Sequence, residues 1–344
     1  MLSLGVDFDT TAWRVAAWDE DRAADLHTFG SAEELWEFVD VLRSVHPATP
    51  LVLPSGFGVP LTRVAEIMDQ DIFEMTLERR WQSTDTLGRF LAEARRRALR
   101  AYCIPAVKLL PSVPPHRKLN RVDLGTSDVL CAAVWAIHCL SSADHPRSTC
   151  DFVLLHTRPG ARSLLVVRAG QVVDGIGANA GHPELGQSEP LCGLASQPAH
   201  DRTVSRATGT SDHVAGYSQE ACCEALQKQV FGLLGFHKLS RVILTGVRRA
   251  EISQTLKEQL PIASLPTPPD GFEPALGAAV VAAGLTGGPT AELVEHLGLR
   301  EARERVLDWI TPGALDAQSA PAGVGKGAGS LVPPPENDAQ PERS

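Results

Sequence analysis

The chain has 344 residues, of which 43% are hydrophobic and 21% charged, so it is long enough for two ordinary domains and apolar enough to be globular. A net charge of −9 and a pI near 5.7 argue against a general nucleic-acid-binding protein, which usually has a basic face. The charge is unevenly placed, because residues 1–78 carry 15 acidic side chains and four arginines, whereas residues 79–121 carry 11 basic and two acidic ones. One part of the chain is therefore strongly cationic.

Secretory and membrane proteins are disfavoured as well. The first residues lack a basic leader with a long apolar core, so we expect no signal peptide, and no apolar stretch approaches the roughly 20 residues that a spanning helix needs. The seven cysteines include no Cys-x-x-Cys pair, which gives little support to a zinc site or a disulfide framework. We expect a cytoplasmic protein that acts on a small molecule, with no nucleic-acid or membrane partner, and a homodimer is left open.

The first half of the chain predicts a strand hairpin followed by a helix. Residues 2–9 and 12–20 are short β-rich runs on either side of Thr10 and Thr11. Ser31 is a candidate N-cap, and Glu34 three residues later completes a capping-box pattern. A strand that enters a glycine- and proline-rich loop and two further helices are then predicted at residues 51–61, 85–100 and 128–140.

The second half repeats this order. Three strands are predicted in residues 151–175, with their second turn at Ala169 and Gly170. A helix, a buried strand and three more helices are predicted at residues 217–236, 240–246, 250–260, 275–285 and 290–310. Gly, Pro, Ala and Ser dominate from residue 311, which predicts a disordered tail at 311–344. The repetition predicts an α/β protein with two similar lobes, residues 1–149 and 150–310.

The turn after the first strand carries a phosphate-binding pattern. In the segment GVDFDTTAWRV, four residues match G-x-D-x-G-T-T, and the segment resembles the first phosphate-binding hairpin of the acetate kinase / sugar kinase / actin superfamily; they are Gly5, Asp7, Thr10 and Thr11. The resemblance implies that backbone N–H groups and threonine hydroxyls face nucleotide phosphates, while Asp7 orients hydrated Mg²⁺. Asp9 stands where the pattern has glycine, and its carboxylate would repel phosphate oxygens unless a metal intervenes. An ordinary β-hairpin with a polar turn is the alternative.

The most distinctive stretch is a cationic loop that leads into a helix, in residues 108–133. Guanidinium groups and the unpaired N–H groups of a helix start suit an anion. The stretch is similar to the hallmark of a small family, known mainly as a domain of unknown function and often labelled predicted butyrate kinase, which is a divergent member of the same superfamily. The matching residues are His116, Arg117, Lys118, Asn120, Arg121, Asp123, Gly125, Thr126 and Asp128. The alternative is structural: Arg121 and Asp123 pair, and Thr126 caps the helix.

Three other loops resemble the superfamily less closely. The loop at Ser55 and Gly56 looks like a substrate loop, although a simple surface turn explains it nearly as well. A glycine-rich loop with Asp174, Gly175 and Gly177 and a strand ending at Gly246 resemble nucleotide-binding segments. The second phosphate motif is replaced, because its strand–turn–strand has His156, Arg158, Pro159 and Gly160 where an Asp and glycines are usual.

Together, the resemblance implies an α/β fold of two ribonuclease-H-like lobes with a nucleotide cleft between them. It implies an ATP- and Mg²⁺-dependent phosphotransferase for a small acceptor, such as a short-chain carboxylate. The implied catalytic residues are Arg121 and Asp123. The implied cofactor-binding residues are Asp7 (also the metal ligand), Thr10, Thr11, Gly125, Thr126, Asp174, Gly175, Gly177 and Gly246, and the implied substrate-binding residues are Ser55, Gly56, His116 and Arg117. The alternatives are a non-catalytic nucleotide sensor or scaffold and a binder of anionic polymers through residues 79–121.

Overall fold

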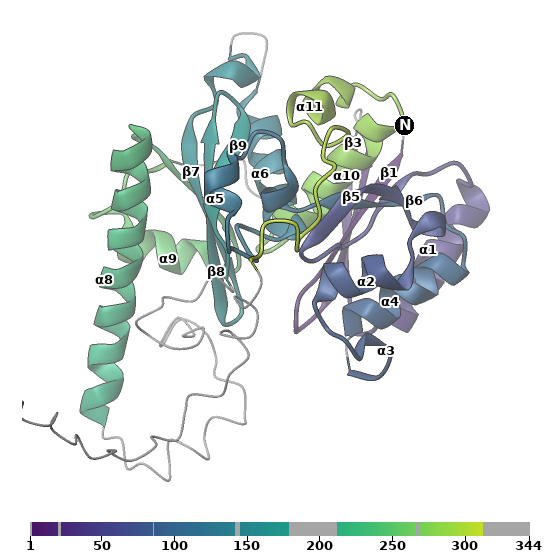
Figure 1. Ribbon diagram of the computed structural model, residues 1–344, viewed down its shortest axis with the longest axis horizontal. Coiled ribbons are helices and arrows are strands. Elements are labelled where there is room, and N and C mark those ends of the chain that lie inside the picture. Colours follow the sequence, from purple (N-terminus) through teal and green to yellow (C-terminus); the bar gives the residue numbers. More distant parts are fainter. Residues whose placement is uncertain are drawn as a thin grey trace, which may run out of the picture. The chain divides into compact units, whose positions relative to one another are not determined.

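The structure is a computed structural model (Figure 1), and it describes residues 2–311 except 20–21, 85, 142–144, 179–211, 264 and 266–267. Residues Met1–Ile310 form one compact unit. The tail predicted at 311–344 lies outside the described residues, apart from Thr311.

The first sheet has six strands in the order β3-β2-β1-β4-β6-β5. Its strands are β1 Ser3–Phe8, β2 Trp13–Asp19, β3 Arg22–Phe29, β4 Leu51–Val52, β5 Gly58–Arg63 and β6 Ala101–Pro105. Strands β1, β2 and β3 form an antiparallel meander, β4 pairs in parallel with β1 and β6, and β5 is antiparallel to β6.

The second sheet has five strands in the order β11-β10-β7-β8-β9. Its strands are β7 Phe152–Arg158, β8 Ala161–Arg168, β9 Gln171–Ile176, β10 Val242–Gly246 and β11 Ile262–Ala263. An antiparallel meander, β7-β8-β9, is again followed by parallel strands, β10 and β11. The two sheets therefore share one topology apart from the additional antiparallel strand β5 in the first, and the predicted α/β class with two similar lobes is confirmed.

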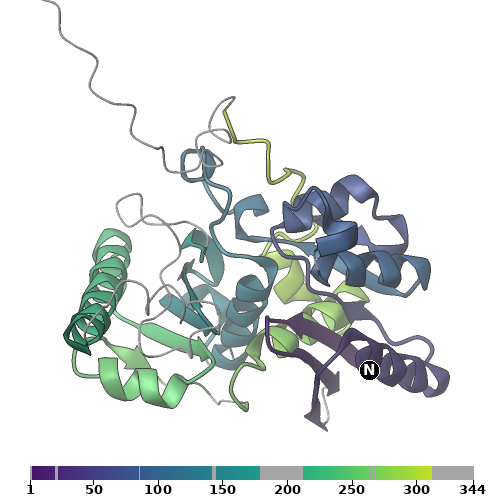
Figure 2. The ribbon, with the colours of Figure 1, turned by 90° about the horizontal axis from the view of Figure 1, so that it is seen from below.

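Helices flank both sheets (Figure 2). In the first part of the chain they are α1 Ala32–Val45, α2 Asp69–Thr76, α3 Trp81–Thr84, α4 Thr86–Arg96, α5 Pro115–Lys118 and α6 Ser127–Leu140. In the second part they are α8 Asp212–His237, α9 Arg249–Leu256, α10 Glu273–Leu285 and α11 Ala291–His296. Single 3₁₀ turns occur at Val64–Glu66, Val107–Leu109 and Arg147–Thr149.

The outer face of each sheet is covered by helices that pack apolar side chains against it. Leu4 and Val6 of β1 pack with Leu35 of α1 and Phe90 of α4 in one buried cluster. In the second sheet, residues 153 and 155 of β7 pack with the apolar sides of α8 and α9. The strands thus direct alternate residues to opposite faces, as a period of two requires.

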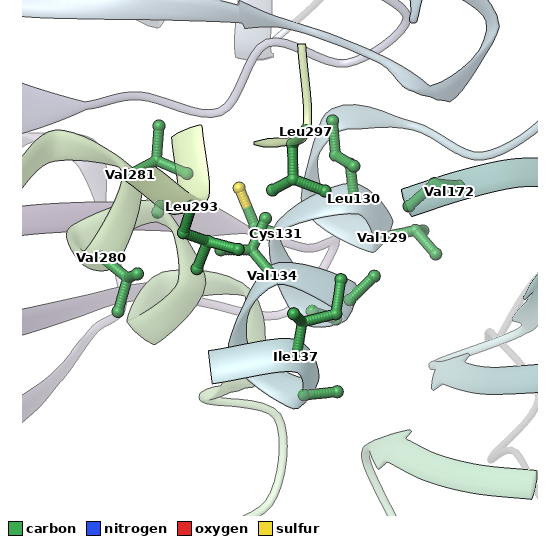
Figure 3. Packing of buried hydrophobic residues seen from close by; sticks show 14 of the residues in the cluster. Val129, Leu130, Cys131, Val134, Ile137, Val172, Val280, Val281, Leu293 and Leu297 are labelled. Carbon is green, nitrogen blue, oxygen red and sulfur yellow. The ribbon is translucent and has the colours of Figure 1, made fainter. Parts of the chain in front are cut away.

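Helices α6 and α10 form the central layer of the core. Both contribute to one buried cluster with Val52 and Ile104 of the first sheet and with Phe152 and Leu154 of the second. Figure 3 shows the side chains of α6, α10 and α11 packed together in this cluster. Alanine and glycine in α10 permit close approach, because a Cβ atom on Gly277 would stand 1.8 Å from the main-chain oxygen of Cys131 in α6.

Several elements of the structure differ from the predicted ones. Ser31 is the N-cap of α1 as predicted, but the Glu34 carboxylate accepts from the N–H of Gly30 rather than from Ser31. Strands β3 and β6 were not expected from the sequence pattern. The helix predicted at 290–310 is wrong beyond His296, because Gly298 has a φ of +67° and its neighbours close a Schellman-type C-cap.

The boundary between the lobes at residues 149 and 150 stays a prediction. Among the helices that the structure describes, none combines the length and apolar character that crossing a bilayer requires.

Candidate functional site

Two hairpin turns, one from each sheet, lie beside each other. The first joins β1 to β2, and the second joins β7 to β8. Arg158, the last residue of β7, donates from Nη1 to the main-chain oxygen of Phe8, the last residue of β1, at 2.9 Å. Residues that are 150 positions apart thus form one site.

The carboxylate of Asp9 closes the first turn from within. Its Oδ1 atom accepts hydrogen bonds from the Thr11 N–H at 2.7 Å, the Thr11 hydroxyl at 2.5 Å and the Ala12 N–H at 3.0 Å. Its Oδ2 atom accepts from Nη1 of Arg14 at 2.5 Å. Burial would raise the pKa of Asp9, but the hydrogen bonds from Thr11 and Arg14 outweigh burial and lower it. An anionic group therefore already occupies the donors of this turn.

The guanidinium of Arg158 bridges two more carboxylates. Its Nη2 atom lies 2.6 Å from Oδ1 of Asp7 and 3.0 Å from Oδ2 of Asp128. Asp7 belongs to β1 and Asp128 to the first turn of α6. Burial raises the pKa of Asp7 to about 6, although Arg158 acts in the opposite direction.

A cavity of about 330 Å³ lies next to this bridge, at the lower end of the range of small-molecule sites. Its polar lining includes Thr10, Asp128, His156 and Arg158. Apolar side chains make up other parts of its wall, and they include Pro54, Leu87 and Val129. The cavity thus combines a few polar groups with apolar surface, as ligand sites do.

His156 is a buried neutral side chain on this wall. Its Nδ1 atom is 3.0 Å from the hydroxyl of Thr245, and its Nε2 atom has no hydrogen-bond partner within the described part of the chain. Burial, assisted by Arg158, lowers the pKa of His156 to about 3, so the ring is uncharged near neutral pH.

The charged groups of the site are thus three carboxylates and two guanidinium groups. They belong to Asp7, Asp9, Asp128, Arg14 and Arg158.

Some predicted site residues meet at this cavity. Thr10, Gly56 and Thr126 line it. Asp7 does not line it but contacts Arg158, which does. Thr126 is the N-cap of α6, but its side chain makes no capping hydrogen bond. The start of α6 thus borders the cavity, and its dipole favours a negative charge there.

Ser55 instead lies inside the protein. Its hydroxyl donates to the main-chain oxygen of Leu53 at 3.0 Å and accepts from the Ile104 N–H at 3.1 Å. Its own N–H donates to the hydroxyl of Ser127 at 3.0 Å, at the start of α6. The side chain is fully buried, so in this arrangement it holds the loop onto β6 and α6.

Four other predicted residues pack together beside this cavity without lining it, since Gly125 and Gly177 directly precede the lining residues Thr126 and Ala178. Asp123 accepts from the N–H of Gly125 at 2.7 Å, and it is buried. A Cβ atom on Gly175 would stand 1.9 Å from the main-chain oxygen of Leu124, and one on Gly177 would stand 1.9 Å from Oδ1 of Asp123. The cationic-loop motif and the glycine-rich loop therefore touch along their backbones.

The basic residues of the distinctive motif point to different places. His116 and Arg121 are exposed, and neither lines the cavity at Arg158. Arg117 donates to the main-chain oxygen of Val173 at 2.7 Å, and its Nε atom lies 3.4 Å from Asp174. The same oxygen of that carboxylate, Oδ2, lies 3.0 Å from Nε2 of His237. Arg117 and Asp174, two of the predicted site residues, thus form an ion pair with each other.

Two lysines of the same motif hold the end of the compact unit. Lys118 donates from Nζ to the main-chain oxygen of Leu110 at 2.9 Å and to the carboxylate of Glu304 at 2.5 Å. Lys108 donates to the main-chain oxygen of Val306 at 2.5 Å, and burial lowers its pKa to about 8. Part of the motif is therefore structural.

Gly246 ends β10 in a conformation that favours glycine. Its φ is +96°, and a Cβ atom there would stand 2.0 Å from the main-chain oxygen of Thr157. Its N–H donates to Oε2 of Glu273 at 3.3 Å, and Glu273 in turn pairs with Arg249 at 2.6 Å. Burial raises the pKa of Glu273 to about 7, although Arg249 opposes the rise.

The residues around Asp7 do not fit a hydrated Mg²⁺ ion as the resemblance implied. Such an ion takes oxygen ligands that include one or two carboxylates. The carboxylates of Asp7 and Asp128 already contact Arg158, and that of Asp9 already pairs with Arg14. Within the described residues, no group of three His, Cys, Asp or Glu side chains is placed to hold a metal ion.

Sequence reasoning assigned no role to the arginine at the centre of this site. Arg158 and His156 were visible only as departures from the second phosphate motif, and Asp128 only as one member of a longer match. The signal that could have pointed to them was two charged or polar residues at the end of a buried strand. Glu273, the first residue of the small-residue helix α10, gave no signal in the sequence.

A family model described as a protein of unknown function (DUF1464) matches residues 5–312. No curated protein matches the chain by sequence.

Solved structures of low sequence identity resemble the chain in fold. Acetate kinase from Entamoeba histolytica matches with a TM-score of 0.51 and 11% identity, over 75% of this chain and 85% of that chain. A ROK family protein from Streptococcus pneumoniae in complex with sucrose has a TM-score of 0.43 and 11% identity, over 86% and 99% of the two chains. The activator of 2-hydroxyisocaproyl-CoA dehydratase from Clostridium difficile, with bound ADPNP, has a TM-score of 0.40 and 12% identity, over 86% and 97%. The match to acetate kinase shows that the chain has the same two-lobed fold as that protein.

Proposed function

Because the chain belongs to the DUF1464 family and has the fold of acetate kinase, we propose that it is a nucleotide-binding protein whose phosphate turn is closed, acting as a sensor or scaffold rather than as a phosphotransferase. The observation that carries this proposal is the position of Asp9. Its carboxylate accepts hydrogen bonds from the N–H groups of Thr11 and Ala12. The resemblance assigns the backbone N–H groups of this turn to nucleotide phosphates.

Electrostatics support the same proposal. A phosphate that approached the turn would meet the Asp9 carboxylate, and like charges at such short range repel. The metal ion that could screen them has no fitting set of ligands, since Arg158 already neutralises Asp7. The turn that follows Gly246 remains as a candidate contact for the nucleoside, whereas Gly175 and Gly177 are packed against Leu124 and Asp123.

Calorimetry tests nucleotide binding, and a product assay tests turnover. We expect the wild-type protein to bind ATP or ADP, and to form no ADP when it is supplied with Mg·ATP and acetate or butyrate. No binding at millimolar nucleotide would show that the proposed function is wrong.

The matched variants Asp9→Gly and Asp69→Gly test the role of the closed turn. Asp9→Gly frees two N–H groups and removes a charge, so it should bind ATP about tenfold more tightly while its affinity for adenosine is unchanged. Asp69 is an exposed residue at the start of α2, paired with Arg95, and its replacement should alter neither affinity. An equal response of the two variants would contradict the role given to Asp9.

A second candidate is the butyrate-kinase-like activity that the resemblance implies. The cavity beside Arg158 favours it, because the apolar walls at Leu87 and Val129 suit the alkyl chain of a short-chain acid. This activity requires Asp9 to leave the turn. Formation of ADP by the wild-type protein with any short-chain acid would favour this candidate over the sensor.

A further inference from the structure

Three oxygen atoms converge on the guanidinium of Arg158. They are Oδ1 of Asp7 at 2.6 Å, Oδ2 of Asp128 at 3.0 Å and the main-chain oxygen of Phe8 at 2.9 Å. Two carboxylates and one carbonyl are the oxygen types that hard divalent cations bind in proteins. A cation at this point is stabilising, because two buried carboxylates that repel each other are costly without one.

The fit of the guanidinium is incomplete at one of these oxygens. Oδ2 of Asp128 is buried and makes no hydrogen bond within the described residues, although Nη2 of Arg158 lies 3.0 Å from it. The side chain of Asp128 is only 9% exposed, so water is largely kept away. A planar guanidinium has fixed N–H directions, whereas a spherical ion could face all three oxygens at once. The contact with Asp128 is thus one of charge without a directed hydrogen bond.

Arg158 also has little freedom to leave. It ends a strand that is paired on both sides, and its side chain is 22% exposed. If Arg158 left, the carboxylate of Asp7, which is 3% exposed, would remain as an unpaired charge in a buried position.

We propose that Arg158 is a built-in cation that stands in the position of a divalent metal ion. The site therefore needs no metal, and replacement of Arg158 by an uncharged side chain converts it into a divalent-cation site formed by Asp7, Asp128 and the main-chain oxygen of Phe8. This inference concerns the cation alone, so it is tested without nucleotide and stands or fails separately from the proposed function.

Binding of Mn²⁺ alone, measured from the free-ion signal by electron paramagnetic resonance, tests the proposal. We expect Arg158→Met to bind one Mn²⁺ per chain at least about tenfold more tightly than the wild-type protein does, and Mg²⁺ to displace it. The matched control is Arg147→Met, which removes a guanidinium that pairs with Glu292 at the surface and should gain nothing. Adding Asp128→Asn to Arg158→Met should abolish the gain. Equal uptake of Mn²⁺ by the wild-type protein and Arg158→Met would overturn the proposal.

A second measurement needs no variant, in case Arg158→Met does not fold. The Tm of the wild-type protein should be the same in MgCl2, in EDTA and in NaCl of equal ionic strength. A saturable rise in Tm that is specific to Mg²⁺ would overturn the proposal, because ligands that bind the folded state stabilise it.

Discussion

The carboxylate of Asp123 lies directly against the α-carbon of Gly177, since a Cβ atom built on Gly177 would stand 1.9 Å from Oδ1 of Asp123. The two residues belong to motifs that are more than fifty positions apart in the printed sequence. Asp123 is buried and accepts from the N–H of Gly125, so its carboxylate fills the space between the loop before α6 and the loop after β9.

Gly177→Ala should therefore destabilise the protein. The new methyl group would overlap the Asp123 carboxylate, and relief of that overlap should cost about 1–3 kcal/mol in the free energy of unfolding. Urea denaturation measures this cost. The matched control is Gly235→Ala on α8, where nothing lies within 4 Å of the new Cβ atom, and it should gain up to about 1 kcal/mol. Equal effects would show that the Asp123 contact is not tight.

Ser55→Ala separates a structural role from substrate binding. The variant leaves the N–H of Ile104 without its acceptor in the core, so the free energy of unfolding should fall by about 1–3 kcal/mol. Ser44→Ala, which removes an exposed hydroxyl from α1, should stay within about 0.5 kcal/mol. Nucleotide affinity measured by calorimetry should be unchanged in both. A Ser55→Ala protein that is as stable as the wild type but has lost nucleotide binding would contradict the structural role given to Ser55.

Lys118→Met should loosen the segment around Glu304. The variant leaves the main-chain oxygen of Leu110 and the carboxylate of Glu304 without their shared donor, at a cost of about 1–3 kcal/mol. Limited proteolysis should cut residues 303–310 faster than in the wild-type protein. Arg63→Met removes an exposed pair with Glu66 at 3.9 Å, so its cleavage rate should match the wild type. Unchanged cleavage in Lys118→Met would contradict the anchoring role.

Glu273 predicts a dependence of stability on pH. Burial raises its pKa in the folded state to about 7 from the ordinary value of 4.5, so the folded protein holds a proton that the unfolded chain has released. The stability that this proton contributes is fully present below pH 4.5 and is lost as the pH rises through about 7. The Tm of Glu273→Gln, which does not titrate, should therefore rise relative to the wild type between about pH 5 and pH 8. A relative fall would mean that the pair with Arg249 dominates.

Local patterns in the sequence were sufficient for much of the fold. Alternation and turn residues located the hairpins at Thr10 and at Ala169, and Ser31 marked the start of α1, because these features depend on near neighbours. The repeated order of elements gave the two lobes. The short strand β6 and the early end of α11 were not found, since the first depends on pairing with distant strands and the second on one glycine.

The candidate site was only partly accessible from the sequence. Asp9 could be recognised as out of place in its pattern, and the structure explains how its charge is satisfied by Thr11 and Arg14. The pairing of Arg158 with Asp7 depends on two hairpins that meet only in the folded chain. Helical and loop patterns also do not distinguish Lys118, which is buried, from Arg121, which lies three positions later and is exposed.

The packing of α10 on β1 has a consequence for how the chain is made. A Cβ atom on Gly5 would stand 1.9 Å from the main-chain oxygen of Ala275, so the helix lies directly on the first strand. The ribosome completes this helix only after the whole second sheet has been synthesised. Until then the inner face of the N-terminal sheet stays uncovered in the nascent chain, where chaperones and proteases can reach it. The earliest residues to emerge are thus among the last to acquire their native neighbours.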